Sequence, residues 1–194
     1  MLKKTSKGPN FGLKTRKLIE QGILPIGKSL EEILFDLRIT KAPNVLEMFG
    51  FLSRVHRRNG IIVAEGLVSC QKVTQAFTQY LVDSLQNSTT SPMDVFKYHA
   101  VGTGTTAEAN SQTTLVTEVE SRVSGTQVEG ASANIFKTVA TVTFTGTHAI
   151  SEHGIFSASA NGTMMDRSVL SPVDNVISSD EIEYTYQLTV NAET

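Results

Sequence analysis

The sequence has little of several features that would narrow its function at once. It contains no tryptophan and one cysteine, Cys70, so a disulfide within the chain is excluded. That count fits a reducing compartment, or one in which redox conditions do not matter. No apolar run approaches the length of a membrane-spanning helix. The first residues also lack the apolar stretch of a secretory signal peptide. We therefore expect a protein that has no membrane segment.

Positive charge is missing from the end of the chain. No Lys or Arg follows Arg167, and residues 61–194 hold 5 basic residues against 14 acidic ones. Residues 1–60 hold 12 basic residues against 5 acidic ones, although the net charge of the whole chain is only −2. This asymmetry indicates a nucleic-acid-binding arm, head-to-tail electrostatic pairing between copies, or two faces that are simply solvated.

The basic residues gather first in residues 1–17, where no acid precedes Glu20. Gly8, Pro9 and Gly12 oppose helix formation there, so we expect an extended arm that is ordered only on a partner. Its charges are spread out rather than dense, which favours a protein surface over nucleic acid as that partner. The candidate contact residues in the arm are Lys3, Lys4, Lys7, Lys14, Arg16 and Lys17.

Two short helices are predicted between the arm and residue 60. Ser29 with Glu32 forms a capping box at the start of residues 29–42, and Asn44 with Glu47 forms a similar pair at the start of residues 44–57. A basic cluster ends the second segment. It either complements a helix C-terminus or contacts an acidic partner, and we include three of its residues among the candidate partner-binding residues. These are Arg54, Arg57 and Arg58.

Strand patterns dominate residues 61–194. In residues 136–144, Phe136, Ala140, Val142 and Phe144 share one face, which indicates a strand packed on a core. The last strand is the clearest, because apolar residues alternate with polar ones throughout residues 181–190. Further strands are predicted at residues 61–69, 96–101, 115–123, 150–157 and 164–170. Residues 171–179 are predicted to form a loop.

One helix and two turns complete this part of the chain. Apolar residues at helical spacing predict an amphipathic helix over residues 72–86, and Asn59–Gly60 and Asn161–Gly162 are hairpin signals. We therefore divide the chain into a basic N-terminal arm with short helices, residues 1–60, and a β-rich domain, residues 61–194. The fold class is mainly β, an antiparallel β-sandwich or jelly-roll-like domain with one amphipathic helix.

No constellation typical of catalysis or metal binding stands out. His148 and His153 would point to opposite faces of one strand, which makes a poor metal site, and His99 is expected to be a hydrogen-bonded structural residue. The glycines of residues 102–107 lack the lysine of a phosphate-binding loop, so a tight connection is expected there. Asp166 and Arg167 are expected to form a local or interface ion pair. We predict no catalytic residue, no cofactor and no metal.

Several stretches together resemble a known family. They include VTQAFTQYLVDSLQ, FKYHAVGTGTTAEANSQTTLVTEV, GTQVEGASANIFKTVATVTF, EHGIFSA and EIEYTYQLTV, and they cover about two thirds of the chain. They resemble small virion structural proteins encoded by tailed bacteriophages. The stretches GTGTTAEA and EHGIFSA are the most specific of them. Residues 1–60 carry none of this resemblance.

The resemblance implies a non-enzymatic virion protein made in the bacterial cytoplasm. A capsid decoration (cement) protein fits best, with the major capsid protein or other virion proteins as partners and a homo-oligomer, a trimer by preference, as its assembly. A neck, tail or fibre component is the alternative within the particle. From a different class, a nucleic-acid-binding coat protein would use the basic arm instead.

Overall fold

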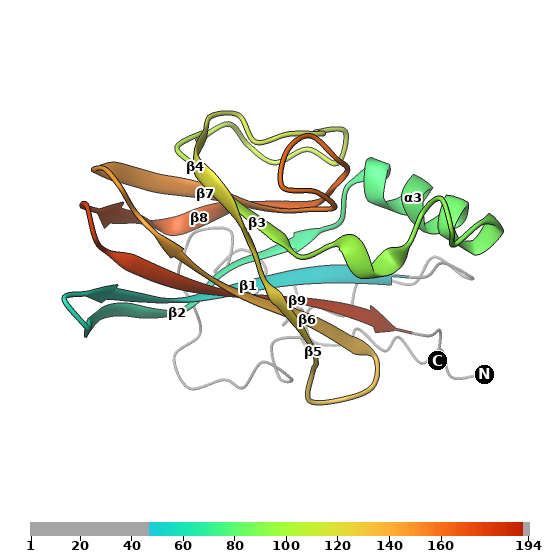
Figure 1. Ribbon diagram of the computed structural model, residues 1–194, viewed down its shortest axis with the longest axis horizontal. Helices are drawn as coiled ribbons and strands as arrows, with labels where there is room; N and C mark the ends of the chain where they lie inside the picture. Colours follow the sequence, from blue (N-terminus) through green and yellow to red (C-terminus); the bar gives the residue numbers. More distant parts are fainter. Residues whose placement is uncertain (1–46, 192–194) are drawn as a thin grey trace, which may run out of the picture. The chain divides into compact units, whose positions relative to one another are not determined.

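The computed structural model describes residues 47–191, which form nine strands, one α-helix and a short 3₁₀ helix (Figure 1). The predicted arm, the predicted helix at residues 29–42 and the six basic residues of the arm lie outside the described residues. The strands are β1 (Glu47–Arg58), β2 (Ile61–Lys72), β3 (Tyr98–Gly102), β4 (Glu118–Ser124), β5 (Thr126–Glu129), β6 (Ile135–Thr143), β7 (His148–Phe156), β8 (Met164–Val176) and β9 (Glu181–Asn191). Helix α3 spans Gln75–Gln86, and the 3₁₀ helix η1 spans Met93–Val95.

The strands form two antiparallel sheets that pack face to face as a β-sandwich. One sheet has five strands in the order β2-β1-β9-β6-β5, and the other has four in the order β4-β3-β7-β8. Every pairing between neighbouring strands is antiparallel. The predicted fold class, mainly β with a sandwich architecture, is therefore confirmed.

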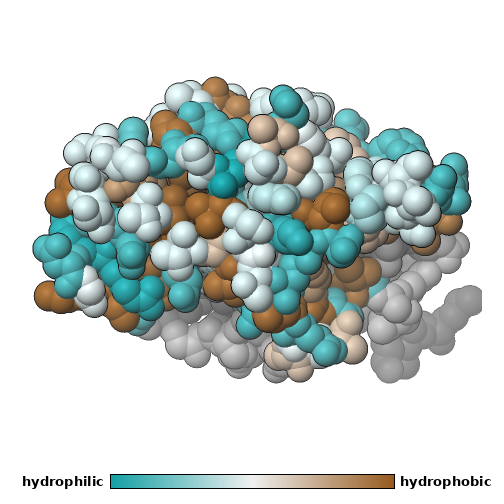
Figure 2. Space-filling model, viewed as in Figure 1, coloured by the Kyte–Doolittle hydropathy of each residue, from teal (hydrophilic) through white to brown (hydrophobic). Residues whose placement is uncertain are grey.

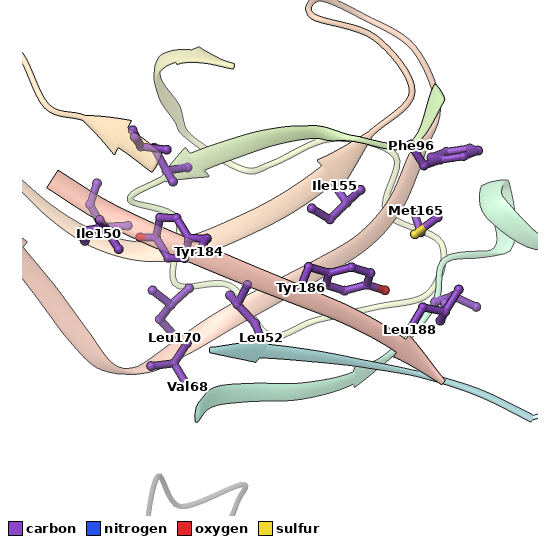
Figure 3. Close-up of a cluster of buried hydrophobic side chains, with 14 of the residues drawn as sticks. Leu52, Val68, Phe96, Ile150, Ile155, Met165, Leu170, Tyr184, Tyr186 and Leu188 are labelled. Atoms are coloured by element: carbon purple, nitrogen blue, oxygen red, sulfur yellow. The ribbon is translucent and has the colours of Figure 1, made fainter. Parts of the chain in front are cut away.

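The core lies between the two sheets (Figure 3). Strand β9 contributes Ile182, Tyr184, Tyr186 and Leu188 to it, because alternate side chains of a strand point to the same face. This is the alternation predicted for residues 181–190. Strand β6 contributes in the same way and buries Ala140 and Val142 on its inner face. The predicted inner faces of both strands are confirmed.

Helix α3 confirms the helix predicted at residues 72–86, with a later start. It begins at Gln75 because the side chain of Thr74 caps it and accepts a hydrogen bond from the Phe77 amide at 3.1 Å. Phe77 is buried, and its ring packs edge-on against Phe96, with centroids 5.1 Å apart. Tyr80 packs against the same Phe96 ring, so one aromatic cluster attaches the helix to the sandwich.

The predicted helix at residues 44–57 is wrong, because this segment contains strand β1. Strand β1 lies between β2 and β9 in the five-stranded sheet, so sheet pairing overrides the capping-box signal of Asn44 and Glu47. The sandwich consequently starts before the predicted domain boundary at residue 61. The compact unit that contains both sheets spans Leu46–Thr194. A chain that began at residue 61 would lose a central strand.

The loop predicted at residues 171–179 is mostly strand, since β8 continues to Val176. Pro172 is tolerated because β8 is an edge strand, and the register with β7 shifts between the pairs Ile150–Asp174 and Glu152–Val169. The two hairpin signals are confirmed. Asn59 and Gly60 have φ of 50° and 77°, and Asn161 and Gly162 have φ of 56° and 73°.

Candidate functional site: a buried ion pair and the loop it anchors

A buried ion pair joins the two strands at the edge of the four-stranded sheet. Arg167 on β8 donates from Nε to Oε2 of Glu152 on β7 at 2.7 Å, and neither side chain exposes more than 1% of its surface. Both residues point away from the sandwich core, toward residues 103–117, which connect β3 to β4. A buried pair of this kind is strongly destabilised when one partner is removed, because the other charge is left unpaired.

Glu152 also anchors the connection from β3 to β4. Its carboxylate accepts hydrogen bonds from the backbone amides of Gly104 at 3.0 Å, Val116 at 3.0 Å and Thr117 at 2.7 Å. Burial raises the pKa of Glu152, but these amides and Arg167 outweigh it and hold the pKa below its ordinary value. One carboxylate therefore joins the two ends of this long loop.

The middle of the same loop is held from β8. Arg167 donates from Nη1 to the Thr106 carbonyl at 3.0 Å and to Oε1 of Gln112 at 3.2 Å. The Glu108 carboxyl accepts a short hydrogen bond from the Val169 amide. Burial raises the pKa of Glu108 to about 7. The loop is thus fixed at its ends by Glu152 and along its length by β8.

A second apolar cluster lies where the loop covers the sheet. It consists of Ala100, Leu115, Phe156 and Met164, with Tyr98 packed against it. Two glycines, Gly102 at the end of β3 and Gly104 in the loop, are needed for close approach, because a Cβ on them would lie 2.5 or 2.6 Å from Oε1 of Glu152. The glycines therefore admit the anchoring carboxylate, which agrees with the tight connection expected from the sequence.

Two buried histidines meet on the inner side of the four-stranded sheet. Nδ1 of His99 lies 3.1 Å from Nε2 of His153, and Nε2 of His99 lies 3.1 Å from the Thr138 hydroxyl. Burial lowers the pKa of His99 to about 3 and that of His153 well below its ordinary value, so both rings are neutral near pH 7. The expectation that His99 is a hydrogen-bonded structural residue is confirmed.

Asp166 and Arg167 do not form the ion pair expected from their adjacency. Successive residues of a strand point to opposite faces, so Arg167 reaches Glu152 while Asp166 points between the sheets. The Asp166 carboxylate accepts a hydrogen bond from the Ser168 hydroxyl at 2.9 Å and faces the Tyr186 hydroxyl. Burial raises the pKa of Asp166 to about 7. The aspartate and the tyrosine both lie over Gly50, where a Cβ would be 2.6 Å from Oδ2 of Asp166.

The basic cluster that was predicted at a helix end lies on strand β1 instead. Arg54 is 5% exposed and bonds through Nε to both carboxylate oxygens of Asp174, at 2.8 and 2.9 Å. Arg54 is thus engaged within the domain, and its predicted role as a contact to a partner stays a prediction. Arg58 donates to Asp180, as close as 2.7 Å, and Arg57 lies 4.0 Å from Glu183. Both keep about a third of their side chains exposed, and their partner-binding role stays a prediction.

Asp180 collects several of these contacts at the turn between β8 and β9. Its carboxylate accepts hydrogen bonds from Arg58 and, at 3.0 Å, from the Ile177 amide. It also lies 3.0 Å from Nε2 of His56. The Arg58 hydrogen bond is the main reason that the pKa of Asp180 lies well below its ordinary value. The same hydrogen bond raises the pKa of Arg58. The cluster therefore ties the β1–β2 hairpin to the β8–β9 turn.

These arrangements join strands β1, β7 and β8, the β8–β9 turn and the loop at residues 103–117. Within residues 47–191, no group of three or more His, Cys, Asp or Glu side chains is placed to hold a metal ion. Over the same part of the chain, no helix is long and apolar enough to cross a membrane. Glu152, Arg167, Arg54, Asp174 and Asp180 are buried in these contacts, whereas Arg57 and Arg58 stay partly exposed.

The acidic partners were missed by reasoning from the sequence. Glu152, Asp174 and Asp180 each occupy a site set by residues far away in the sequence, and a single acid in a strand does not indicate its partner. The one available signal was Glu152 itself, the only acid in the predicted strand at residues 150–157. Comparisons with protein-family models, with curated proteins and with solved structures found no match to this chain.

Proposed function

We propose that this chain is a structural protein of a tailed-bacteriophage particle, and within that class a capsid decoration (cement) protein. One observation carries the proposal: the described domain uses its ionisable side chains to hold itself together. Glu152, Arg167, Arg54, Asp174 and Asp180 are at most 5% exposed. A domain whose ionisable side chains are paired internally suits binding to other proteins through a rigid surface.

The stretches that carry the resemblance support the same conclusion. GTGTTAEA contains Gly104, and EHGIFSA begins with Glu152, the carboxylate that accepts the Gly104 amide. The two most specific stretches are therefore two parts of one structural unit, the anchored loop on its sheet. The resemblance therefore covers residues that determine the architecture of the domain. This supports a structural protein.

In this proposal the β-sandwich binds at the particle surface while residues 1–17 supply electrostatic attachment to a shell protein. One exposed ion pair contributes roughly 0–1 kcal/mol. Several basic residues must therefore act together, and many copies on one particle add avidity. A neck, tail or fibre position remains the second proposal within the particle, and a copy number of about a dozen instead of hundreds would favour it.

A nucleic-acid-binding coat protein is the proposal from another class. The excess of basic residues in residues 1–60 favours it. Such a protein would be retained on DNA with an affinity that falls steeply with salt, because bound cations are released from the phosphates. Retention on DNA across a salt series therefore separates this proposal from attachment to protein.

The test is co-sedimentation of purified protein with particles that have been stripped of it. Deletion of residues 1–17, or the pair Lys3→Glu and Lys4→Glu, should weaken attachment at low salt, and the difference from the wild type should shrink as salt rises and screens the arm. The matched control is Lys97→Glu with Lys137→Glu, which reverses two charges on the sandwich. If the truncated chain sediments as well as the full chain at every salt concentration, the arm does not attach the protein.

A further inference from the structure

Two turns of the sandwich contain the dipeptide Asn-Gly in similar backbone conformations. Asn59–Gly60 forms the tip of the β1–β2 hairpin, and Asn161–Gly162 lies between β7 and β8. All four residues are exposed and adopt positive φ. Asparagine is a thermolabile residue, and a glycine that follows it shields its own backbone nitrogen least, because it has no Cβ. By sequence alone, the two asparagines are equally reactive.

The Asn59–Gly60 turn has free space around it. A Cβ on Gly60 would meet no heavy atom within 4 Å, and within residues 47–191 no hydrogen bond involves the Asn59 side chain. The turn is closed by the pair Arg58–Ile61, and Ile61 is 69% exposed. Figure 1 shows this hairpin projecting at the left end of the sandwich, and Figure 2 shows hydrophilic residues with a few hydrophobic ones at that end. A tip with so few buried contacts opens locally at low cost.

The Asn161–Gly162 turn is braced by the residues around it. Arg122 on β4 donates from Nη1 to the Asn161 carbonyl at 2.6 Å, and the arginine side chain itself is only 6% exposed. The Thr163 amide donates to Oγ of Ser157 at 2.8 Å across the same loop. A Cβ on Gly162 would lie 2.8 Å from that oxygen. Both the backbone and the space beside it are therefore fixed here.

We propose that Asn59 is a site of spontaneous deamidation in the folded protein, and that the brace on the second turn protects Asn161. The side chain of Asn59 can swing toward the Gly60 nitrogen when the hairpin tip opens, whereas the same movement at Asn161 requires the Arg122 hydrogen bond to break. The inference goes beyond the proposed function and does not rest on it.

The reaction needs only water besides the chain itself. The Gly60 nitrogen loses its proton to solvent and attacks Cγ of Asn59, forming an N–Cγ bond. The Cγ–Nδ2 bond breaks, and Nδ2 takes up a proton and leaves as ammonia, so that a five-membered succinimide ring remains. Water then opens this ring at either of its two carbonyls and yields aspartate or isoaspartate. One water is consumed, one ammonia is released, and nothing is oxidised or reduced.

The two products affect the hairpin differently. Asp-Gly favours the same kind of turn as Asn-Gly, so the aspartate product keeps the hairpin. Isoaspartate carries one more backbone methylene group, which does not fit the two-residue turn between Arg58 and Ile61. Either product adds a negative charge near Arg57 and Arg58, whose side chains are 31% and 37% exposed. The reaction therefore lowers the positive charge at this end of the sandwich.

Peptide mapping by mass spectrometry measures the rate at each site. The purified full chain is kept in mildly alkaline buffer, folded in one sample and unfolded in urea in the other. Asparagine, aspartate and isoaspartate are quantified over time at residues 59 and 161. In urea the two sites should react at similar rates, because both precede glycine. In the folded protein Asn59 should react at least about tenfold faster than Asn161, which corresponds to an opening that costs about 1.4 kcal/mol less.

Equal rates in the folded protein, a faster reaction at Asn161, or an Asn59 that reacts only in urea would overturn the proposal. Arg122→Lys tests the brace, because lysine keeps the charge but loses the planar fork of donors. The rate at Asn161 should rise severalfold in this variant, while an unchanged rate at Asn59 serves as the internal control. An Asn161 that stays protected in folded Arg122→Lys would contradict the role of the brace. If this variant does not fold, the comparison of folded and unfolded wild type still decides.

Asn59→Asp provides the reference for the aspartate product. Its midpoint of denaturant unfolding should match that of the wild type, because Asp-Gly keeps the turn. The isoaspartate fraction of aged protein, separated by chromatography, should unfold at a lower denaturant concentration. An isoaspartate fraction as stable as the wild type would contradict the effect on the hairpin.

Discussion

Glu152 on β7 accepts a hydrogen bond at 2.7 Å from Nε of Arg167 on β8. The same carboxylate accepts hydrogen bonds from three backbone amides of the loop at residues 103–117. The ion pair therefore connects the sheet to the longest irregular segment of the described chain. Loops of this length without secondary structure are uncommon in compact domains. Here the order of the loop follows from one buried carboxylate and its arginine.

Replacing Glu152 by Gln should be strongly destabilising. The change removes the negative charge beside the buried guanidinium of Arg167, and we expect the free energy of unfolding to fall by about 3–5 kcal/mol. Chemical denaturation measures it. The control is Glu183→Gln, which removes the charge 4.0 Å from Arg57 in a pair whose side chains are 31% and 39% exposed, and should cost under about 1 kcal/mol. Equal losses in both variants would contradict the role of the buried pair.

Replacing Gly104 by Ala should disturb the same anchor from the loop side. A Cβ at this position would lie 2.5 Å from Cβ of Val116 and 2.6 Å from Oε1 of Glu152, so the loop must shift. We expect a loss of about 1–3 kcal/mol by thermal or chemical unfolding. Gly146→Ala is the control, because its nearest neighbour would be the His148 ring at 3.1 Å. A stable Gly104→Ala variant would show that the glycine is not needed for close approach.

Much of the sheet could be predicted from the sequence because its strands are half buried. In β9 the alternation from Ile182 to Leu188 has a period of two and indicates the inner face directly. The turns at Asn59–Gly60 and Asn161–Gly162 could also be predicted, because Asn-Gly favours turns in which both residues adopt positive φ, as they do here. The residues within each strand or turn determine these features, so the sequence of that segment is enough to predict them.

Strand β1 and the ion pairs could not be read in the same way. Residues 48–52 are MFGFL, a continuous apolar run that fits a helix or a strand equally, and only the pairing with β2 and β9 decides between them. The partner of Glu152 depends on which residues of β8 face it. For the same reason Asp166 and Arg167, neighbours in sequence, belong to separate networks on opposite faces of their strand.

Arg54 and Arg57 should differ sharply although both were predicted to contact a partner. Arg54→Ala leaves Asp174 buried without its guanidinium, and we expect a loss of about 3–5 kcal/mol in unfolding experiments. Arg57→Ala removes a distant, partly exposed pair with Glu183, so stability should change by about 0.5 kcal/mol or less. An Arg54→Ala variant as stable as Arg57→Ala would contradict the structural role assigned to Arg54.

Stability should depend on pH through Asp166. Burial raises the pKa of its carboxyl from 3.8 to about 7 in the folded state. Between about pH 4 and pH 7 the folded chain holds a proton that the unfolded chain has lost, so stability falls as pH rises through this window. Above about pH 7 the contribution is constant.

Asp166→Asn isolates this contribution. The difference in unfolding free energy between wild type and variant, measured from pH 4 to pH 8, should move in favour of the variant as pH rises. The comparison is needed because His99, with a folded pKa of about 3, has the opposite effect and lowers stability as pH falls below about 6.5. A difference that stays constant across the range would mean that Asp166 titrates normally in the folded chain.

The central proposal is that this protein is a structural part of a phage particle, and its position in that particle tests it most directly. An electron cryo-microscopy map of the intact particle, at a resolution that separates strands, should contain the two-sheet domain on the outer surface of the capsid. Quantitative mass spectrometry of the same particles should give on the order of hundreds of copies, as many-copy binding requires. Density for the domain only at the neck or tail would replace the decoration proposal by the second one, and the absence of the protein from purified particles would contradict the account.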